Sequence, residues 1–184
     1  MNDGTEHDKP GMQNMRRACI GLCLSLWLFS FPACDLGVGN SGGYSLAIYR
    51  LEDSSLTAAN VWALPLKDLR LADAPFLTLE DIRVYNWKTH EFAVTAQPDS
   101  QLARLQRRLG PTSGIPWVLT VDDERVYLGA FWYSYSSLMP QVPYIDILIE
   151  PHRIWRDYTD GTQSDQRADP RIYRVLKNAG VLIE

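Results

Sequence analysis

The sequence predicts an α+β fold, with helices on one face of a mostly antiparallel sheet. The first observation is a β-hairpin, because residues 115–121 and 125–132 are apolar and aromatic and flank the acidic turn Asp122-Asp123-Glu124. The second is that two segments carry strong helix start and stop signals, and the third is that other short segments alternate between apolar and polar residues. Strands and helices mixed in this order favour helices packed on an antiparallel sheet.

The first part of the domain is expected to be mainly extended. Residues 44–50 alternate and predict the first strand. Residues 52–60 are polar and turn-like, with a short helix as an alternative, and residues 61–71 look extended. Pro65 interrupts this last segment, so it is predicted to be a bent or edge strand.

Two helices and a strand are expected next. Thr78 can cap a short helix, with Asp81 three residues on as in a capping box. Residues 90–95 alternate as a strand. Pro98 then opens a second helix, which places Leu102, Leu105 and Leu109 on one stripe and ends at Gly110-Pro111.

After the hairpin, one strand and one helix complete the predicted domain. Residues 144–150 alternate, with isoleucines at 145, 147 and 149, and predict a strand. Residues 157–168 are polar and predict a loop. Asp169 can cap a last helix with Pro170 at its first position, a buried stripe of Ile172, Val175, Leu176 and Ala179, and Gly180 at its end.

The segment before this domain has the pattern of an export signal. Arg16-Arg17 precede an apolar run at residues 18–31, which has the length of a signal-peptide core and is short for a membrane-spanning helix. Residues 1–11 are acidic, which is unusual for a signal peptide, so Met12 or Met15 is an alternative start.

Phe31-Pro32-Ala33-Cys34 resembles the lipobox of bacterial lipoproteins, in which a small residue precedes the cysteine that accepts lipid. Phe31 and Pro32 depart from the commonest residues of that pattern, and an ordinary cleaved signal or an uncleaved anchor is the alternative. The resemblance implies a signal peptide at 1–33, acyl chains such as palmitate on Cys34, a Gly-rich tether at 34–43 and a domain at 44–184. It also implies a place in the cell envelope outside the cytoplasm. Asp35 implies the inner membrane if the organism is of the enteric type.

Composition and cysteine usage narrow the function classes. The chain has 46% hydrophobic residues, which is typical of a globular domain, and a formal net charge of −4, which argues against nucleic acid as a partner. Cys19 and Cys23 lie in the predicted signal, and lipid would block Cys34. We therefore expect no disulfide, cysteine metal site or thiol chemistry in the domain, and no cofactor.

Several segments resemble a set of uncharacterised bacterial lipoproteins. The matching segments are Leu77-Thr78 with Asp81-Ile82, Gly114-Ile-Pro116 through Asp122, Tyr127-Leu-Gly-Ala-Phe-Trp132 and Asp169-Pro-Arg-Ile172. The set implies no activity. More distantly, the order of a threonine-capped helix, strand, helix, hairpin and final helix is similar to the first periplasmic domain of the SecD export subunit.

Candidate chemical residues in the domain are few. His90 lies in an alternating segment and is read as structural, whereas His152 could act as a general base beside Asp146 or Glu150. Asp122, Asp123 and Glu124 are read as turn residues, since they lack the spacing of a calcium loop. No catalytic residue and no metal ligand is assigned.

The aromatic segment at residues 131–137 is the candidate binding surface. Alternation puts Phe131, Tyr133 and Tyr135 on one side of a strand and Trp132 on the other. Core packing explains such a pattern, but an exposed aromatic surface could bind a sugar ring or a peptide. The candidate surface comprises Trp132, Tyr133, Tyr135, Ser136 and Ser137.

The function favoured by the sequence is that of a lipid-anchored envelope protein without enzymatic activity. Its partners would be membrane lipid, through Cys34, and another envelope protein or a cell-wall component. Two alternatives stay open. One is an accessory factor in envelope protein export or quality control, and the other is a hydrolase that uses His152.

Overall fold

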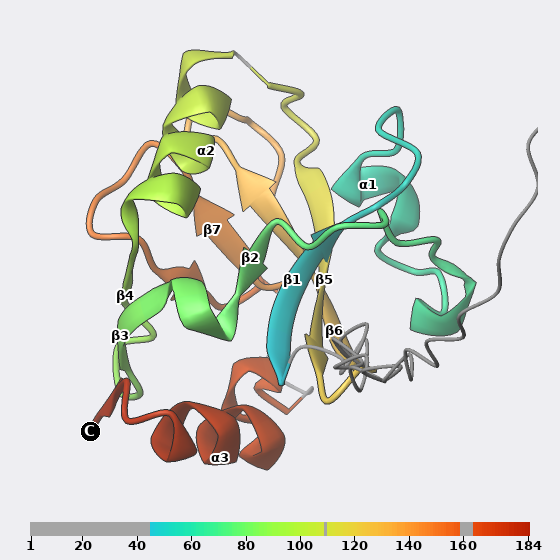
Figure 1. The fold of residues 1–184 in the computed structure, drawn as a ribbon. Helices are drawn as coiled ribbons and strands as arrows, with labels where there is room; N and C mark the ends of the chain where they lie inside the picture. The colour runs from blue at the N-terminus through green and yellow to red at the C-terminus, as the bar shows by residue number, and fades with distance from the viewer. Residues whose placement is uncertain (1–44, 109, 159–163) are drawn as a thin grey trace, which may run out of the picture. The chain divides into compact units, whose positions relative to one another are not determined.

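The computed structural model describes residues 45–108, 110–158 and 164–184, all within the compact unit Ser41–Glu184. The predicted signal peptide, tether, Cys34, Asp35, Tyr44 and Leu109 lie outside the described residues. Within them, the α+β class and the mostly antiparallel pairing are confirmed (Figure 1).

A six-stranded sheet forms the centre of the domain, and each neighbouring pair is antiparallel except β6 and β7. Its strands, in spatial order, are β2 (Leu77–Thr78), β1 (Leu46–Arg50), β5 (Ile115–Val121), β6 (Glu124–Trp132), β7 (Tyr144–Asp146) and β8 (Ile154–Trp155). The predicted hairpin is therefore β5–β6. Asp122 and Asp123, with φ of 49° and 63°, form its turn.

A three-stranded sheet lies beside the first, in the order β4 (Phe92–Val94), β3 (Ile82–Asn86) and β9 (Leu182–Ile183). A bridge between Glu91 and Arg153 links it to the β8 end of the large sheet. The backbone N–H of Ile154 also donates to the carbonyl of His90 at 3.0 Å. The small sheet is therefore joined to the β8 edge of the large sheet, and residues of both sheets pack in one core.

The longer helices are α2 (Ala96–Arg107) and α3 (Pro170–Asn178), and α1 (Ala58–Val61) is a single turn. Short 3₁₀ turns are η1 (Leu66–Asp68), η2 (Leu79–Asp81) and η3 (Gln166–Ala168). Figure 1 shows α2 and α3 on one side of the large sheet and α1 on the other. The expectation of helices on one face therefore holds for α2 and α3 but does not include α1.

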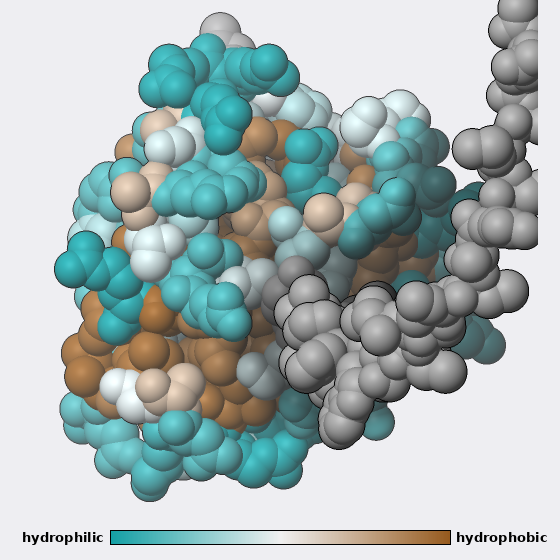
Figure 2. Space-filling model, in the orientation of Figure 1, coloured by the Kyte–Doolittle hydropathy of each residue, from teal (hydrophilic) through white to brown (hydrophobic). Residues whose placement is uncertain are grey.

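The large sheet is buried on both faces, and β6 shows how. Tyr127 and Phe131 enter a large core with α2, α3 and the small sheet. Leu128, Ala130 and Trp132 enter a second core on the other face, with α1 and the segment around Leu69. Figure 2 shows apolar side chains gathered between β3 and α3, where the large core comes nearest to the surface, while the outer sides of α2 and α3 are hydrophilic.

Several predicted elements have different bounds in the structure. Residues 61–71 are not a strand, because their apolar side chains turn in α1 and η1 to cover the second face of the sheet. The strand predicted at 144–150 ends at Asp146, whose Oδ1 accepts the N–H of Leu148 in a turn. Ala179, expected in the buried stripe of α3, is exposed.

The segment around Thr78 is a capping box, but on a 3₁₀ turn rather than a helix. The N–H and hydroxyl of Thr78 both donate to Asp81 Oδ2, at 2.8 and 2.9 Å. A strand that the sequence did not predict, β3, follows directly at Ile82. It forms a hairpin with β4, and His90, expected in a strand, has φ of 57° in the turn between them.

Candidate functional site

Trp132 is the last residue of β6, and its indole reaches the surface between two hollows. The residue is buried, with 6% of it exposed, and its ring lies 6.3 Å from that of Tyr144 at an interplanar angle of 61°. β6 and β7 are parallel neighbours in the sheet. The chain must therefore leave the sheet after Trp132 and return to the start of β7 through a crossover connection. That connection, residues 133–143, folds over Trp132 and forms part of both hollows.

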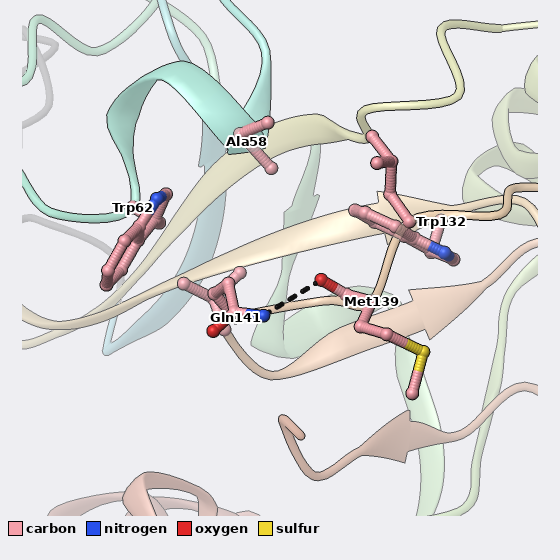
Figure 3. Close-up of a pocket in the computed structure, with 8 residues that line it drawn as sticks. Ala58, Trp62, Trp132, Met139 and Gln141 are labelled. Carbon is pink, nitrogen blue, oxygen red and sulfur yellow. Dashed lines mark hydrogen bonds between the residues drawn. The ribbon is translucent and has the colours of Figure 1, made fainter. Parts of the chain in front are cut away.

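The first hollow has a volume of about 240 Å³. Trp62, at the end of α1, and Trp132 lie at its two sides, with Met139 and Gln141 between them (Figure 3). Gln141 Nε2 donates to the carbonyl of Met139 at 3.1 Å and so steadies the connection. The lining is therefore mainly aliphatic and aromatic.

The second hollow has a volume of about 310 Å³ and shares Trp132, Leu138 and Met139 with the first. Four aromatic side chains line it: Trp132, Tyr144, Trp155 and Tyr158. The Tyr144 ring stacks on Trp155 at 6.5 Å and on Tyr158 at 6.2 Å. Burial raises the pKa of Tyr144, and a hydrogen bond with Tyr158 raises it further, so the phenol stays protonated.

Exposed apolar side chains gather at the two hollows. Of the nine large hydrophobic side chains exposed in the described residues, five line one or both hollows, each with 41–56% of its surface exposed. These five are Trp62, Leu138, Met139, Ile149 and Tyr158. We call the two hollows and these five side chains the apolar groove. A gathering of this kind marks a binding surface more often than scattered apolar residues do.

The other members of the candidate surface have mixed positions. Tyr133 is buried in the large core, and its hydroxyl donates to the carbonyls of Leu105 and Arg108 at the end of α2. Tyr135 is 46% exposed and donates to the carbonyl of Gly110 at 3.0 Å. Of the predicted surface, Trp132 and Ser136 line the groove, Tyr133 supports α2, and the exposed Ser137 does not line either hollow.

Sequence reasoning missed most of the groove. Trp62, Met139, Tyr144, Trp155 and Tyr158 come from four separate segments, and only the sheet order and the β6–β7 connection bring them together. The one available signal was the group of apolar residues Leu138, Met139, Pro140 and Val142 just after the aromatic segment.

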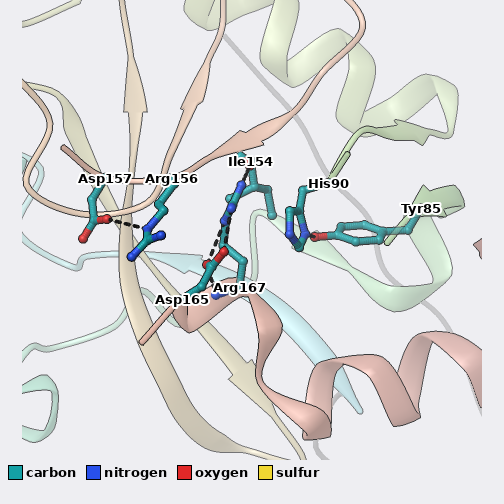
Figure 4. Close-up of polar contacts among 7 residues, drawn as sticks. All are labelled: Tyr85, His90, Ile154, Arg156, Asp157, Asp165 and Arg167. Atoms are coloured by element: carbon teal, nitrogen blue, oxygen red, sulfur yellow. Dashed lines mark hydrogen bonds and ion pairs between the residues drawn. The ribbon is translucent and has the colours of Figure 1, made fainter. Parts of the chain in front are cut away.

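His90 has the structural role expected of it. The Tyr85 hydroxyl and His90 Nδ1 form a hydrogen bond of 2.9 Å (Figure 4), in which either group can donate, depending on the tautomer of the neutral ring. Burial, together with the positive charge of Arg167, lowers the pKa of His90 to about 4. Burial raises the pKa of Tyr85, which keeps its hydroxyl protonated.

Arg167 is held by a buried network near His90. Its guanidinium donates to both carboxylate oxygens of Asp165, at 2.9 and 2.6 Å, and to the carbonyl of Ile154 at 2.8 Å (Figure 4). These hydrogen bonds lower the pKa of Asp165. The network attaches η3 to β8, the strand that ends at the groove residue Trp155.

Within the described residues, His152 is not aligned with a nucleophile. Its side chain is 5% exposed, and its Nε2 lies 3.2 Å from Glu150 Oε1 and 3.8 Å from Asp99 Oδ1. Neither ring nitrogen has a hydrogen-bond partner among the described residues, so no serine is aligned with it there. The predicted neighbour Glu150 is therefore present, but the geometry of an activated nucleophile is missing from this part of the chain.

The acidic turn of the hairpin interacts with α3. Glu124 pairs with Arg171 at 3.1 Å, and Asp122 lies 3.7 Å from Arg174. In the described residues, no group of three histidine, cysteine or acidic side chains is placed to hold a metal ion.

The chain matches no protein-family model, no curated protein and no solved structure with which it was compared. No helix within residues 45–108, 110–158 and 164–184 is long and apolar enough to cross a membrane.

Proposed function

We propose that this chain is a lipid-anchored bacterial envelope protein and a non-enzymatic binding module whose apolar groove receives a segment of another envelope protein. The observation that supports this most is that five of nine exposed large hydrophobic side chains surround two adjoining hollows. Lipid on Cys34 would hold the groove near the membrane, where such a partner is found.

The lining of the groove favours a protein partner over a glycan. A sugar ring stacks on an exposed aromatic face framed by hydrogen-bonding groups, whereas Trp132, the one aromatic residue that lines both hollows, is only 6% exposed. Leu138, Met139 and Val142 supply aliphatic surface instead. Aromatic and methionine side chains are enriched in protein interfaces, and methionine adapts its shape to the side chain that it contacts.

Site-specific cross-linking in cells tests this proposal with the full chain. A photoreactive benzoylphenylalanine replaces Met139 in the groove or, as a control, Lys88 in the exposed turn between β3 and β4. We expect one protein adduct at Met139, mapped by mass spectrometry to one segment of that protein, and no such adduct at Lys88. The added substitution Trp62→Glu should reduce the Met139 adduct at least fivefold, because it places a charge in the first hollow.

Two outcomes would refute the proposal. One is equal adducts at positions 139 and 88, which would indicate contact without a site. The other is an adduct at position 139 that consists of cell-wall glycan, which would assign the groove to a cell-wall component.

A further inference from the structure

The second hollow has the side chains of a site for an organic cation. Aromatic rings from three strands and a loop line it: Trp132, Tyr144, Trp155 and Tyr158. The faces of such rings carry partial negative charge and attract ammonium and guanidinium groups. One cation is already present at this cluster, because the Arg153 guanidinium lies 4.3 Å from the centroid of the Trp155 ring.

A carboxylate lies in the same hollow, and no cation among the described residues, Arg153 included, forms an ion pair with it within 4.0 Å. Asp146, the last residue of β7, is 4% exposed and lines the hollow. Its Oδ1 accepts the N–H of Leu148 at 3.0 Å, and this is its one side-chain hydrogen bond within the described residues.

A buried carboxylate is costly unless a cation or several donors compensate it. An ammonium group entering the hollow would meet the carboxylate and the aromatic rings together. The apolar stem of a lysine side chain would lie along Met139 and Leu138, since lysine buries its methylene groups and carries its charge at the tip.

We propose that the second hollow binds the ammonium group of a lysine side chain in the partner segment, paired with Asp146 and enclosed by the four aromatic rings. This inference rests on the proposed function, because it names the chemistry of the segment that the groove receives. Lysine fits better than arginine, since a planar guanidinium is already stacked at the Trp155 ring.

The test measures binding of small probes to the full chain purified in detergent. The probes are N-acetyl-lysine methylamide, the uncharged N-acetyl-norleucine methylamide of similar shape, and phosphocholine as the cationic headgroup of a lipid. Binding is followed by the NMR signals of the Met139 methyl group and the Trp132 and Trp155 indole N–H groups. We expect saturable shifts with the lysine probe and at least tenfold weaker binding of the norleucine probe.

Asp146→Asn is the decisive variant, because an asparagine oxygen can still accept the Leu148 N–H and preserve the turn. It should reduce the affinity for the lysine probe at least fivefold and leave that for the norleucine probe unchanged. Asp73→Asn is the matched control, since Asp73 is exposed and does not line the hollow, and it should change neither. An unfolding midpoint for each variant separates lost binding from lost structure.

Three results would overturn the inference: equal affinities for the lysine and norleucine probes, no effect of Asp146→Asn in a folded protein, or tighter binding of phosphocholine than of the lysine probe. The last would assign the hollow to a lipid headgroup. If a protein adduct still forms at Met139 while the lysine preference is missing, only the ammonium assignment fails and the proposed function stands.

Discussion

Gly114 lies directly beneath the indole of Trp132, so closely that a Cβ on Gly114 would come within 2.6 Å of Trp132 Cε3. Its φ of 76° lies in the left-handed region that glycine adopts without strain. The Gly114 carbonyl also accepts the N–H of Ala58, the first residue of α1, at 3.0 Å. Gly114 therefore leaves the space that the Trp132 indole occupies and also holds the start of α1 by a hydrogen bond. Trp132 and α1 are both parts of the first hollow.

Gly114→Ala should destabilise the domain by about 2–4 kcal/mol, because it combines left-handed backbone strain with overpacking against Trp132. Gly180→Ala is the matched control. Gly180 has φ of 72°, but no atom lies within 4 Å of its added Cβ, so a loss of about 1–2 kcal/mol is expected from strain alone. Urea unfolding of both variants measures the difference. Equal losses would show that the contact with Trp132 does not matter.

Two Asp-X-Arg ion pairs of the same spacing allow a direct test of how burial changes the contribution of an ion pair to stability. In Asp165–Arg167 the arginine side chain is 10% exposed, whereas in Asp169–Arg171 it is 34% exposed. Arg167→Met should destabilise by about 2–4 kcal/mol, because it removes the guanidinium from Asp165 and the Ile154 carbonyl and leaves Asp165 only the backbone N–H of residue 167. Arg171→Met should cost less than about 1 kcal/mol.

Chemical unfolding at pH 7 measures this pair of variants. A comparable loss in both would mean that the network at Arg167 contributes no more than a surface ion pair.

The stabilisation from the Asp165–Arg167 pair should also depend on pH in the acid range. Since the pKa of Asp165 is lowered in the folded state, its stabilisation is present above its ordinary value of 3.8 and is lost as the pH falls below it.

His90 should make the stability depend on pH in a different range. The pKa of His90 is about 4 when folded and 6.5 when unfolded, so below pH 6.5 the unfolded chain binds a proton that the folded one does not. The free energy of unfolding should therefore fall as the pH is lowered from 6.5 to 4. His90→Asn should remove this slope, because asparagine does not titrate and tolerates the φ of 57°.

Urea unfolding at several pH values between 4.5 and 7.5 measures the slope for the wild type and for His90→Asn. Parallel slopes would show that His90 titrates normally and is not held neutral by burial beside Arg167.

Lipidation of Cys34 is a prediction from the sequence, and mass spectrometry of the N-terminus tests it. When the full chain is made in a bacterium, the mature protein should begin at Cys34 and carry acyl chains, each buried CH₂ adding about 0.8 kcal/mol of membrane attachment. Cys34→Ala should move the protein out of the membrane fraction. Cys23→Ala, in the predicted signal, should leave acylation and fractionation unchanged. An unmodified Cys34 in the wild type would contradict the lipid anchor.

The sequence predicted the elements whose signals are local. The β5–β6 hairpin, α2, and α3 with its Asp169 cap and Pro170 start all have the expected positions within two residues, because turn and capping residues act on their near neighbours. The strand β3 was missed because a register shift between Ile82 and Val84 breaks the alternation that marks a strand.

The groove could be predicted only in part, because its side chains meet through tertiary structure. Trp132 was identified from the aromatic segment, but Trp62 was placed in an extended segment that is in fact the end of a helical turn. Asp146 was considered as a partner of His152. Its position in the hollow depends on the end of β7 beside β6, which no local pattern reveals.

The connection from Tyr133 to Pro143 has a consequence for how this protein could diversify. Because parallel strands require a crossing connection, the fold needs a segment here whatever its composition. The hydrogen bond from the Tyr133 hydroxyl to α2 holds the start of the connection. The hydrogen bond from the Ala130 N–H to the Pro143 carbonyl holds its end. Residues 137–141 between these anchors could therefore be exchanged to change what is recognised while the scaffold is kept, much as variable loops do on an antibody domain.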